Sequence, residues 1–345
     1  MNPSNTTPLE YPFPAPPRGG EALEVVPGLM WLRMPLPFAL DHINLWLLAD
    51  GDTWTQIDTG YGDAATRALW SLHFTTTLAH RPISRVIATH YHPDHLGNAA
   101  WLCQRFGCAV AMPQAEYLTA HAIANEHSGY GVAAISALFG AHGTSDEHVA
   151  EIEKRGNQYR RGVPELPFSF FRIQAGDEIA IGPNCWRVIP GHGHSPEHAS
   201  LYCQSMGVCI SGDMLLPKIS TNVSVWPVEP EGDPLARFLV SLEAFSDLPP
   251  ETLILPSHGL PFIGAGARVE QLRAHHAARL RELVEAADTP QSAADFVPVL
   301  FRRELDLQQR FFAMGEAIAH LNHLWRAGRL ERRLADDGRI RFVRP

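Results

Sequence analysis

One stretch, RVIATHYHPDHLGNAA at residues 85–100, constrains what this chain can fold into more than any other. RVIAT has the pattern of a buried strand, and DHLGNAAWLCQRF that of the helix that follows it. Between them lie His90, His92, Asp94 and His95, four side chains of the kind that ligate metal ions. Imidazole and carboxylate groups suit a borderline divalent ion such as zinc. Because α/β proteins commonly keep their chemistry on such loops, the stretch predicts a metal centre in an α/β fold.

The spacing of these four side chains can serve two ions rather than one. His90 and His92 follow the strand directly and can point at a first ion. Asp94 and His95 come where the chain has turned into the helix, so they can project toward a second ion beside the first. An ordinary polar loop would explain one or two such residues at most.

Strand and helix patterns alternate along the chain in two similar blocks. Short strand patterns fill residues 22–60, and a helical pattern follows at 63–80. Strand patterns resume near residue 168 and lead to a helical segment at 234–247. The alanine-rich residues 114–162 interrupt this order, and we expect a helical insertion that can act as a lid. The alternation predicts two similar halves within one domain at 22–265.

The two ends of the sequence differ from this domain. Residues 1–21 are rich in proline, and we expect an extended leader on the surface. From 266 to 345 the pattern is helical and closes with AGRLERRLADDGRIRFVRP, a β-hairpin with Asp-Gly at its turn. Several helices followed by a hairpin form the plan of a small winged-helix-like domain.

Composition narrows the cellular context. The chain has 345 residues, 45% of them hydrophobic, enough for a large core. No apolar run approaches the ~20 residues that span a bilayer, and the N-terminus lacks the features of a signal peptide. The five cysteines are odd in number and form no C-x-x-C pair, so we expect reduced thiols. These observations predict a cytoplasmic protein with no membrane partner.

The charge distribution argues against a nucleic-acid partner. The net charge is −9, although residues 268–345 hold 14 arginines against 11 acidic residues. That excess is small, and the helical segment GEAIAHLNHLWRAGRL is mainly apolar. Only two lysines, Lys154 and Lys218, occur in the whole chain. We therefore expect a structural or dimerising role for the C-terminal region, compatible with a homodimer. We expect the substrate to be a small molecule.

The motif THYHPDHLGN resembles the H-x-H-x-D-H signature of the metallo-β-lactamase superfamily. In that family a further histidine, an aspartate and a last histidine follow in order, each after a strand. Here GHGHSPEHASLY supplies His194, CISGDML supplies Asp213, and LPSHGLP supplies His258. The earlier QIDTG matches another family motif and supplies Asp58. The resemblance implies a four-layer αββα sandwich at 22–265, followed by the winged-helix-like domain.

The resemblance also implies a role for each of these residues. Asp213 would bridge two divalent ions, most readily Zn²⁺, with iron or manganese as other fitting metals, and Asp58 would support the ligands through hydrogen bonds. In GHGHSPEH we expect His192 and His198 to be structural, whereas His42 can lie near the mouth of the site. The remaining ligands would be His90, His92 and His194 for the first ion and Asp94, His95 and His258 for the second.

The resemblance extends to glyoxalase II-like and lactamase-like hydrolases, and it implies a hydrolase whose metal-bridging hydroxide attacks its substrate. Asp94 or Asp213 would accept a proton as the intermediate collapses. We expect the substrate to be a small acyl ester, thioester or lactone. Apolar and aromatic residues near the predicted site favour such a compound, and the candidates for the pocket wall are Tyr130, Phe139, Lys218 and Trp226.

Two alternatives remain at the level of sequence. The same centre would serve an endoribonuclease or phosphodiesterase, but residues 214–257 are too few for the extra domain that the family's long-chain nucleases carry there. A winged-helix regulator that senses a ligand would be expected to lack one or more metal ligands, and none is missing.

Overall fold

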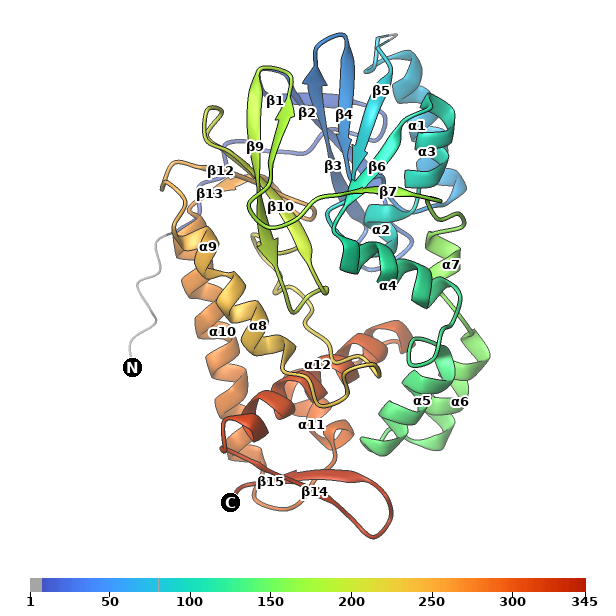
Figure 1. The fold of residues 1–345 in the computed structure, drawn as a ribbon. Helices are drawn as coiled ribbons and strands as arrows, with labels where there is room; N and C mark the ends of the chain where they lie inside the picture. The colour runs from blue at the N-terminus through green and yellow to red at the C-terminus, as the bar shows by residue number, and fades with distance from the viewer. Residues whose placement is uncertain (1–7, 80) are drawn as a thin grey trace.

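Two β-sheets pack face to face at the centre of the computed structural model, which describes residues 8–79 and 81–345 (Figure 1). The first sheet is antiparallel over its first four strands and parallel from β4 to β7. Its seven strands, in spatial order, are β1 (Ala22–Val26), β2 (Leu29–Pro35), β3 (His42–Asp50), β4 (Thr53–Ile57), β5 (Ile83–Ile87), β6 (Ala109–Met112) and β7 (Phe170–Arg172).

The second sheet has six strands, and its only parallel pair among the described residues is β11 with β12. In spatial order its strands are β13 (Phe262–Ile263), β12 (Leu253–Pro256), β11 (Val208–Gly212), β10 (His198–Cys203), β9 (Asn184–Gly191) and β8 (Glu178–Ile181).

Among the described residues, no helix combines the length and the apolar character needed to cross a membrane.

The sheets bury both of their faces, which produces four layers. In β3, Trp46 points between the sheets, whereas Leu45 and Leu47 point outward to helices α1 (Ala64–Thr75) and α3 (Ala99–Phe106). In β10, Leu201 faces the space between the sheets and Tyr202 faces the opposite side. There the six-stranded sheet is covered by α8 (Pro234–Ser241), α9 (Glu243–Ser246) and α10 (Ala265–Ala286). The predicted αββα sandwich is confirmed.

The single helix predicted after the ligand-rich loop is wrong. The chain forms two helices, α2 (Pro93–Leu96) and α3, with Gly97 and Asn98 between them. The Asn98 side-chain amide donates to the carbonyl oxygen of Tyr61 at 2.8 Å, and Gly97 is so closely packed that a Cβ would lie 2.4 Å from the Gly162 carbonyl. Packing against the loop at Tyr61 and against Gly162 interrupts the helical pattern, and local sequence cannot reveal these contacts.

The insertion at 114–162 is helical, as predicted, and lies beside the C-terminal region (Figure 1). Its helices are α4 (Gln114–Ala124), α5 (Val132–Ala141), α6 (Asp146–Arg155) and α7 (Tyr159–Gly162). The C-terminal region continues from α10 with α11 (Ala293–Leu300), α12 (Leu307–Arg326), β14 (Glu331–Leu334) and β15 (Ile340–Val343). This order of helices and hairpin is the predicted one, and the hairpin turn runs through Asp336, Asp337 and Gly338.

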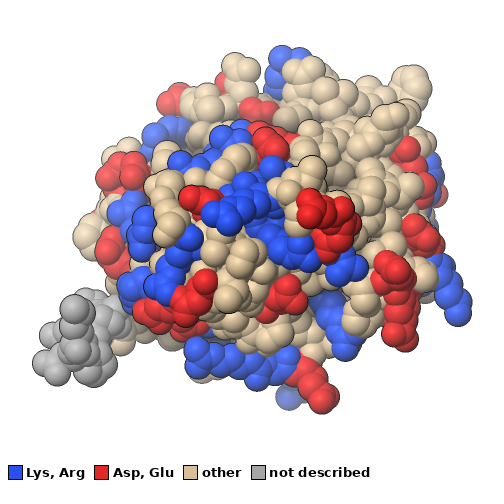
Figure 2. Space-filling view, turned by 90° about the horizontal axis from the view of Figure 1, so that it is seen from below, with Lys and Arg blue, Asp and Glu red and all other residues tan. Residues whose placement is uncertain are grey.

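Acidic and basic side chains alternate on the underside of the molecule, where the hairpin lies (Figure 2). Arg332 pairs with Glu231 at 3.2 Å, and Arg341 pairs with Asp337 within the hairpin at 2.5 Å. Acidic side chains therefore lie among the arginines of the tail on this face.

Part of the proline-rich leader is described, and residues 1–7 lie outside the described residues. Glu10 forms a β-bridge with Ile263, and the Phe13 ring packs edge-to-face on Trp31 with centroids 6.2 Å apart. These contacts fasten the leader to the sheet region.

Candidate metal centre

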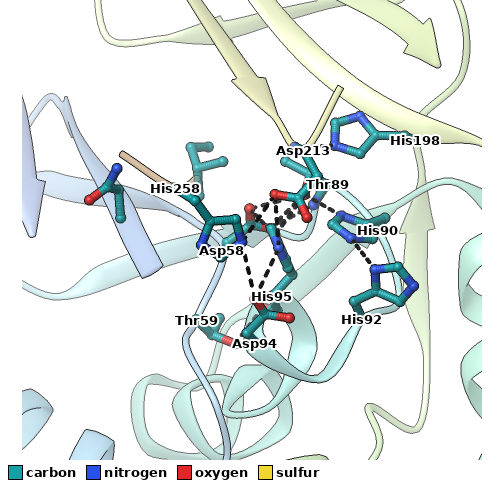
Figure 3. Close-up of polar contacts among 12 residues, drawn as sticks. Asp58, Thr59, Thr89, His90, His92, Asp94, His95, His198, Asp213 and His258 are labelled. Atoms are coloured by element: carbon teal, nitrogen blue, oxygen red, sulfur yellow. Dashed lines mark hydrogen bonds and ion pairs between the residues drawn. The ribbon is translucent and has the colours of Figure 1, made fainter. Parts of the chain in front are cut away.

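Four segments converge where strands of both sheets end, and together they carry the seven predicted ligands. Figure 3 shows this convergence for His90, His92, Asp94, His95, Asp213 and His258. The loop after β5 carries His90 and His92, and the short helix α2 that follows carries Asp94 and His95. His194 follows β9, Asp213 follows β11, and His258 follows β12. Their ligand atoms form two groups, each within 4.8 Å: His90, His92, His194 and Asp213 in the first, and Asp94, His95 and His258 in the second.

The first group has the dimensions of a tetrahedral metal site. The Nε2 atoms of His90 and His194 are 3.2 Å apart, and His90 Nε2 is 2.8 Å from Nδ1 of His92. His194 Nε2 lies 3.3 Å from Oδ2 of Asp213. Zinc bonds of 2.0–2.1 Å in a tetrahedron place ligand atoms about 3.3 Å from one another.

The second group shares Asp213 with the first. Oδ1 of Asp213 lies 3.5 Å from Nε2 of His95 and 3.4 Å from Nε2 of His258. Oδ2 of Asp94 lies 3.6 Å and 3.4 Å from the same two nitrogens. Because one oxygen of Asp213 faces each group, this carboxylate occupies the position of a bridge.

Two atoms of this centre are buried without a hydrogen-bond partner among the described residues, namely His95 Nε2 and Asp213 Oδ1. Buried polar atoms are normally paired, so such atoms call for an explanation. A divalent metal ion bound between them would satisfy both, and the imidazole and carboxylate donors suit such an ion. The residues present therefore fit the metal that the sequence predicts.

Asp58 orients His95 from the end of β4. Nδ1 of His95 donates to Asp58 Oδ2 at 2.8 Å, which leaves Nε2 free to face the centre. The same carboxylate accepts from the backbone N–H of Thr89 at 2.8 Å and from its hydroxyl at 2.9 Å. Asp58 has a positive φ of 55°, a backbone conformation that aspartate tolerates better than most residues. The predicted supporting contact is thus present in the geometry.

Backbone carbonyl groups orient two further ligands. Nδ1 of His194 donates to the carbonyl oxygen of Asn222, and Nδ1 of His258 donates to that of His42, both at 2.8 Å. Each contact turns Nε2 toward the centre. The His42 ring accepts from the backbone N–H of Gly259 at 2.9 Å, so His42 supports the His258 loop.

His198 and His192 lie outside both groups, in keeping with the structural role expected for them. His198 is buried, and its Nε2 accepts from the backbone N–H of Asp213 at 3.2 Å. His192 Nδ1 lies 2.7 Å from the carbonyl oxygen of Pro196 within its own turn.

The buried carboxylates give the centre a preference for positive charge. Burial would lower the pKa of His258, but Asp213 and Asp94 outweigh burial and raise this pKa to about 10. Burial would raise the pKa of Asp94, whereas His95 and His258 lower it to about 2. The carboxylates therefore stay ionised, and the site attracts a cation.

Glu116 on α4 is an important residue that the sequence analysis missed. Its buried carboxylate accepts from the backbone N–H of Tyr91 at 3.0 Å, the hydroxyl of Ser195 at 2.8 Å and the backbone N–H of Glu197. Tyr91 lies between His90 and His92, and Ser195 follows His194. Glu116 thus joins two ligand loops, although a lone acid in an alanine-rich helix carries no sequence signal of this role.

A narrow pocket with a cavity volume of about 20 Å³ opens beside the first group, and His92 and His194 form part of its wall. We call it the inner pocket. Two predicted wall residues, Phe139 and Trp226, line it, together with Phe311 of α12. Tyr130 and Lys218 are not among its lining residues; Tyr130 is half-buried and Lys218 is exposed.

Comparison with known proteins agrees with this geometry. The family description "Metallo-beta-lactamase superfamily" matches residues 39–258, more than half of the chain. The chain belongs to the metallo-β-lactamase superfamily. A second description, "Metallo-beta-lactamase-like, C-terminal domain", matches residues 280–345.

Relatives within the superfamily point to a metal-dependent hydrolase. A beta-lactamase domain protein from Burkholderia ambifaria superimposes with a TM-score of 0.91 at 46% identity, over 98% of each chain. A probable metallo-hydrolase of Bacillus subtilis is 24% identical over 85% of this chain and 91% of its own length. A hydroxyacylglutathione hydrolase of Rhodobacter capsulatus is also 24% identical, over 65% of this chain and 64% of its own length. The chain is thus a superfamily metallo-hydrolase with a histidine and aspartate cluster suited to divalent metal ions.

Proposed function

We propose that this metallo-hydrolase holds two zinc ions and cleaves a small acyl ester, thioester or lactone. The observation that carries the proposal is the Asp213 carboxylate, whose two oxygens face different ligand groups beside an apolar pocket. When bound, two such ions lower the pKa of water toward neutrality and polarise the carbonyl group of a substrate.

The chain's own residues position the substrate, accept a proton and exclude water. His92 and His194 lie on the wall of the inner pocket, so a carbonyl group held there lies next to the centre. The Asp94 side chain is 18% exposed, against 10% for Asp213, which makes Asp94 the more accessible proton acceptor. Phe139 and Trp226 limit the access of water.

The inner pocket favours an acyl group over a polyanion. Its wall combines apolar and aromatic side chains, among them Ile135, Phe139, Val225 and Trp226, and contains no lysine or arginine among the described residues. A phosphodiester substrate would favour cationic side chains, and the hairpin arginines Arg332, Arg333 and Arg341 are paired with acids. The name hydroxyacylglutathione hydrolase, carried by one relative, describes the cleavage of an acyl compound and supports this choice.

The test combines metal analysis with a hydrolysis screen. We expect about two zinc ions per chain and hydrolysis of activated thioesters or lactones in preference to β-lactams and RNA. Removal of metal by a chelator should abolish hydrolysis, and added zinc should restore it. Unchanged activity after complete removal of the metal would refute the mechanism, whereas cleavage of RNA alone would support the phosphodiesterase alternative.

A matched pair of histidine variants provides the control. His194→Ala removes a ligand atom of the first group, so metal content and hydrolysis should both fall. His127→Ala changes an exposed histidine outside the two groups and should alter neither. Equal behaviour of the two variants would contradict the assignment of the centre.

A further inference from the structure

A second and larger pocket lies between the helical insertion and the C-terminal region. Its cavity volume is about 450 Å³, and α5, α6, α11 and α12 contribute to its wall. We call it the outer pocket. Apolar side chains from three of these helices line it, namely Ile152, Val297, Leu307 and Met314. Such a lining can accept a hydrocarbon chain.

The inner and outer pockets meet at two aromatic side chains. Phe139 of α5 and Phe311 of α12 line both pockets, and their rings pack edge-to-face with centroids 5.4 Å apart. The two rings therefore form the boundary between the pockets. An acyl chain too long for the inner pocket would pass this boundary and enter the outer one.

The outer pocket also contains unneutralised positive charge. Its lining includes Arg303 and Arg310, against a single acid, Glu304. Arg310 donates to the carbonyl oxygen of Leu305 at 3.0 Å and contacts the His148 ring. Arg303 donates to the side-chain carbonyl oxygen of Gln309 at 2.8 Å. Within the described part of the chain, neither arginine forms an ion pair with a carboxylate, unlike Arg332 and Arg341 of the hairpin.

We propose that the outer pocket binds the far end of the substrate, and that this end is an anionic group on an apolar acyl chain. The acyl carbonyl lies at the metal centre, the chain passes Phe139 and Phe311, and the anion meets Arg303 and Arg310. Guanidinium groups bind carboxylates and similar anions through paired N–H donors. This inference rests on the proposed acyl hydrolase function and names its substrate class.

The first experiment measures selectivity with the metal-loaded protein. Two thioesters of N-acetylcysteamine, lauroyl and its ω-carboxy counterpart, differ only at the far end of the acyl chain. We expect kcat/KM to be roughly tenfold higher for the ω-carboxy compound, because two charge-assisted contacts are added. In the double variant R303Q/R310Q this ratio should fall to about one. Equal rates for both compounds in the unchanged protein would overturn the proposal.

A matched variant separates local from general charge effects. Arg329→Gln removes an exposed arginine that is absent from the lining of the outer pocket. This variant should keep the full preference for the ω-carboxy compound, and a loss equal to that of R303Q/R310Q would also overturn the proposal. Thermal unfolding midpoints establish that all variants are folded.

If neither thioester is cleaved, that result counts against the proposed function. A binding measurement then still tests the outer pocket. Laurate carries an anion on an apolar chain, and its binding is measured by calorimetric titration of the metal-loaded protein. R303Q/R310Q should weaken this binding about tenfold, and R329Q should leave it unchanged. Equal binding of laurate by the unchanged protein, R303Q/R310Q and R329Q would overturn the assignment of the outer pocket, whatever the result of the hydrolysis experiment.

Discussion

The two sheets contribute to the metal centre in different ways. The seven-stranded sheet supplies four candidate ligands from one continuous segment, between His90 and His95. The six-stranded sheet supplies His194, Asp213 and His258 from three separate loops. A local cluster is constrained mainly by its own backbone, whereas dispersed ligands meet only when the whole sheet is formed. The first contribution is therefore local and the second depends on tertiary structure.

The dispersed ligands are held partly by the opposite sheet. His258 follows β12 of the six-stranded sheet, yet its ring donates to the carbonyl oxygen of His42 in β3. Glu116, from the insertion that follows β6, fastens the loop after His194. By contrast, Asp58 holds His95 from within the seven-stranded sheet. Substitutions of Asp213, Asp58 and Glu116 test this difference.

The largest effect is expected for Asp213→Ala, which removes the side chain shared by both ligand groups. We expect kcat/KM for the thioester to fall by a factor on the order of 10³ or more, since metal stabilisation of the transition state is worth several kcal/mol. Elemental analysis should show fewer than two metal ions per chain. Asp247→Ala, which changes an exposed aspartate, is the control. Full activity of Asp213→Ala would rule out the bridging role of Asp213.

An intermediate effect is expected for Asp58→Asn, which tests the local half of the centre. Asparagine tolerates the positive φ at this position, but its amide group can place a donor opposite Nδ1 of His95. We expect a 10- to 100-fold loss of metal affinity, the usual range for residues that orient metal ligands. A competition titration with a chelator measures this loss. Asp52→Asn, at an exposed turn, should have the metal affinity of the unchanged protein. Equal metal affinities for Asp58→Asn, Asp52→Asn and the unchanged protein would show that His95 needs no support from Asp58.

The smallest effect is expected for Glu116→Gln, which weakens the connection between the ligand loops. Glutamine keeps one acceptor oxygen, so at least one backbone donor, that of Tyr91 or Glu197, loses its partner. The free energy of unfolding in urea should fall by about 1–3 kcal/mol, and kcat/KM should fall only several-fold. The exposed Glu151→Gln is the matched control. A loss of metal affinity in Glu116→Gln larger than that in Asp58→Asn would show that the dispersed ligands depend more on this contact than the local ones depend on Asp58.

Sequence reasoning was most successful where information is local or follows the family order. The strand before His90, the αββα layers and the helical insertion were all predicted from pattern or resemblance and are present. It failed for the break between α2 and α3, because the packing of Gly97 against a distant loop causes that break. It also missed Glu116, whose three donors come from segments 25 to 81 residues away.

The sequence by itself determined the ligand types, their order and the fold class, because strand and helix periods and motif spacing are properties of neighbouring residues. Only the tertiary structure decided which oxygen of Asp213 faces which group, which carbonyl groups orient His194 and His258, and how Phe139 and Phe311 divide two pockets. These features depend on distances between segments that are far apart in the chain. Such distances are set by the packing of whole layers, and no local pattern records them.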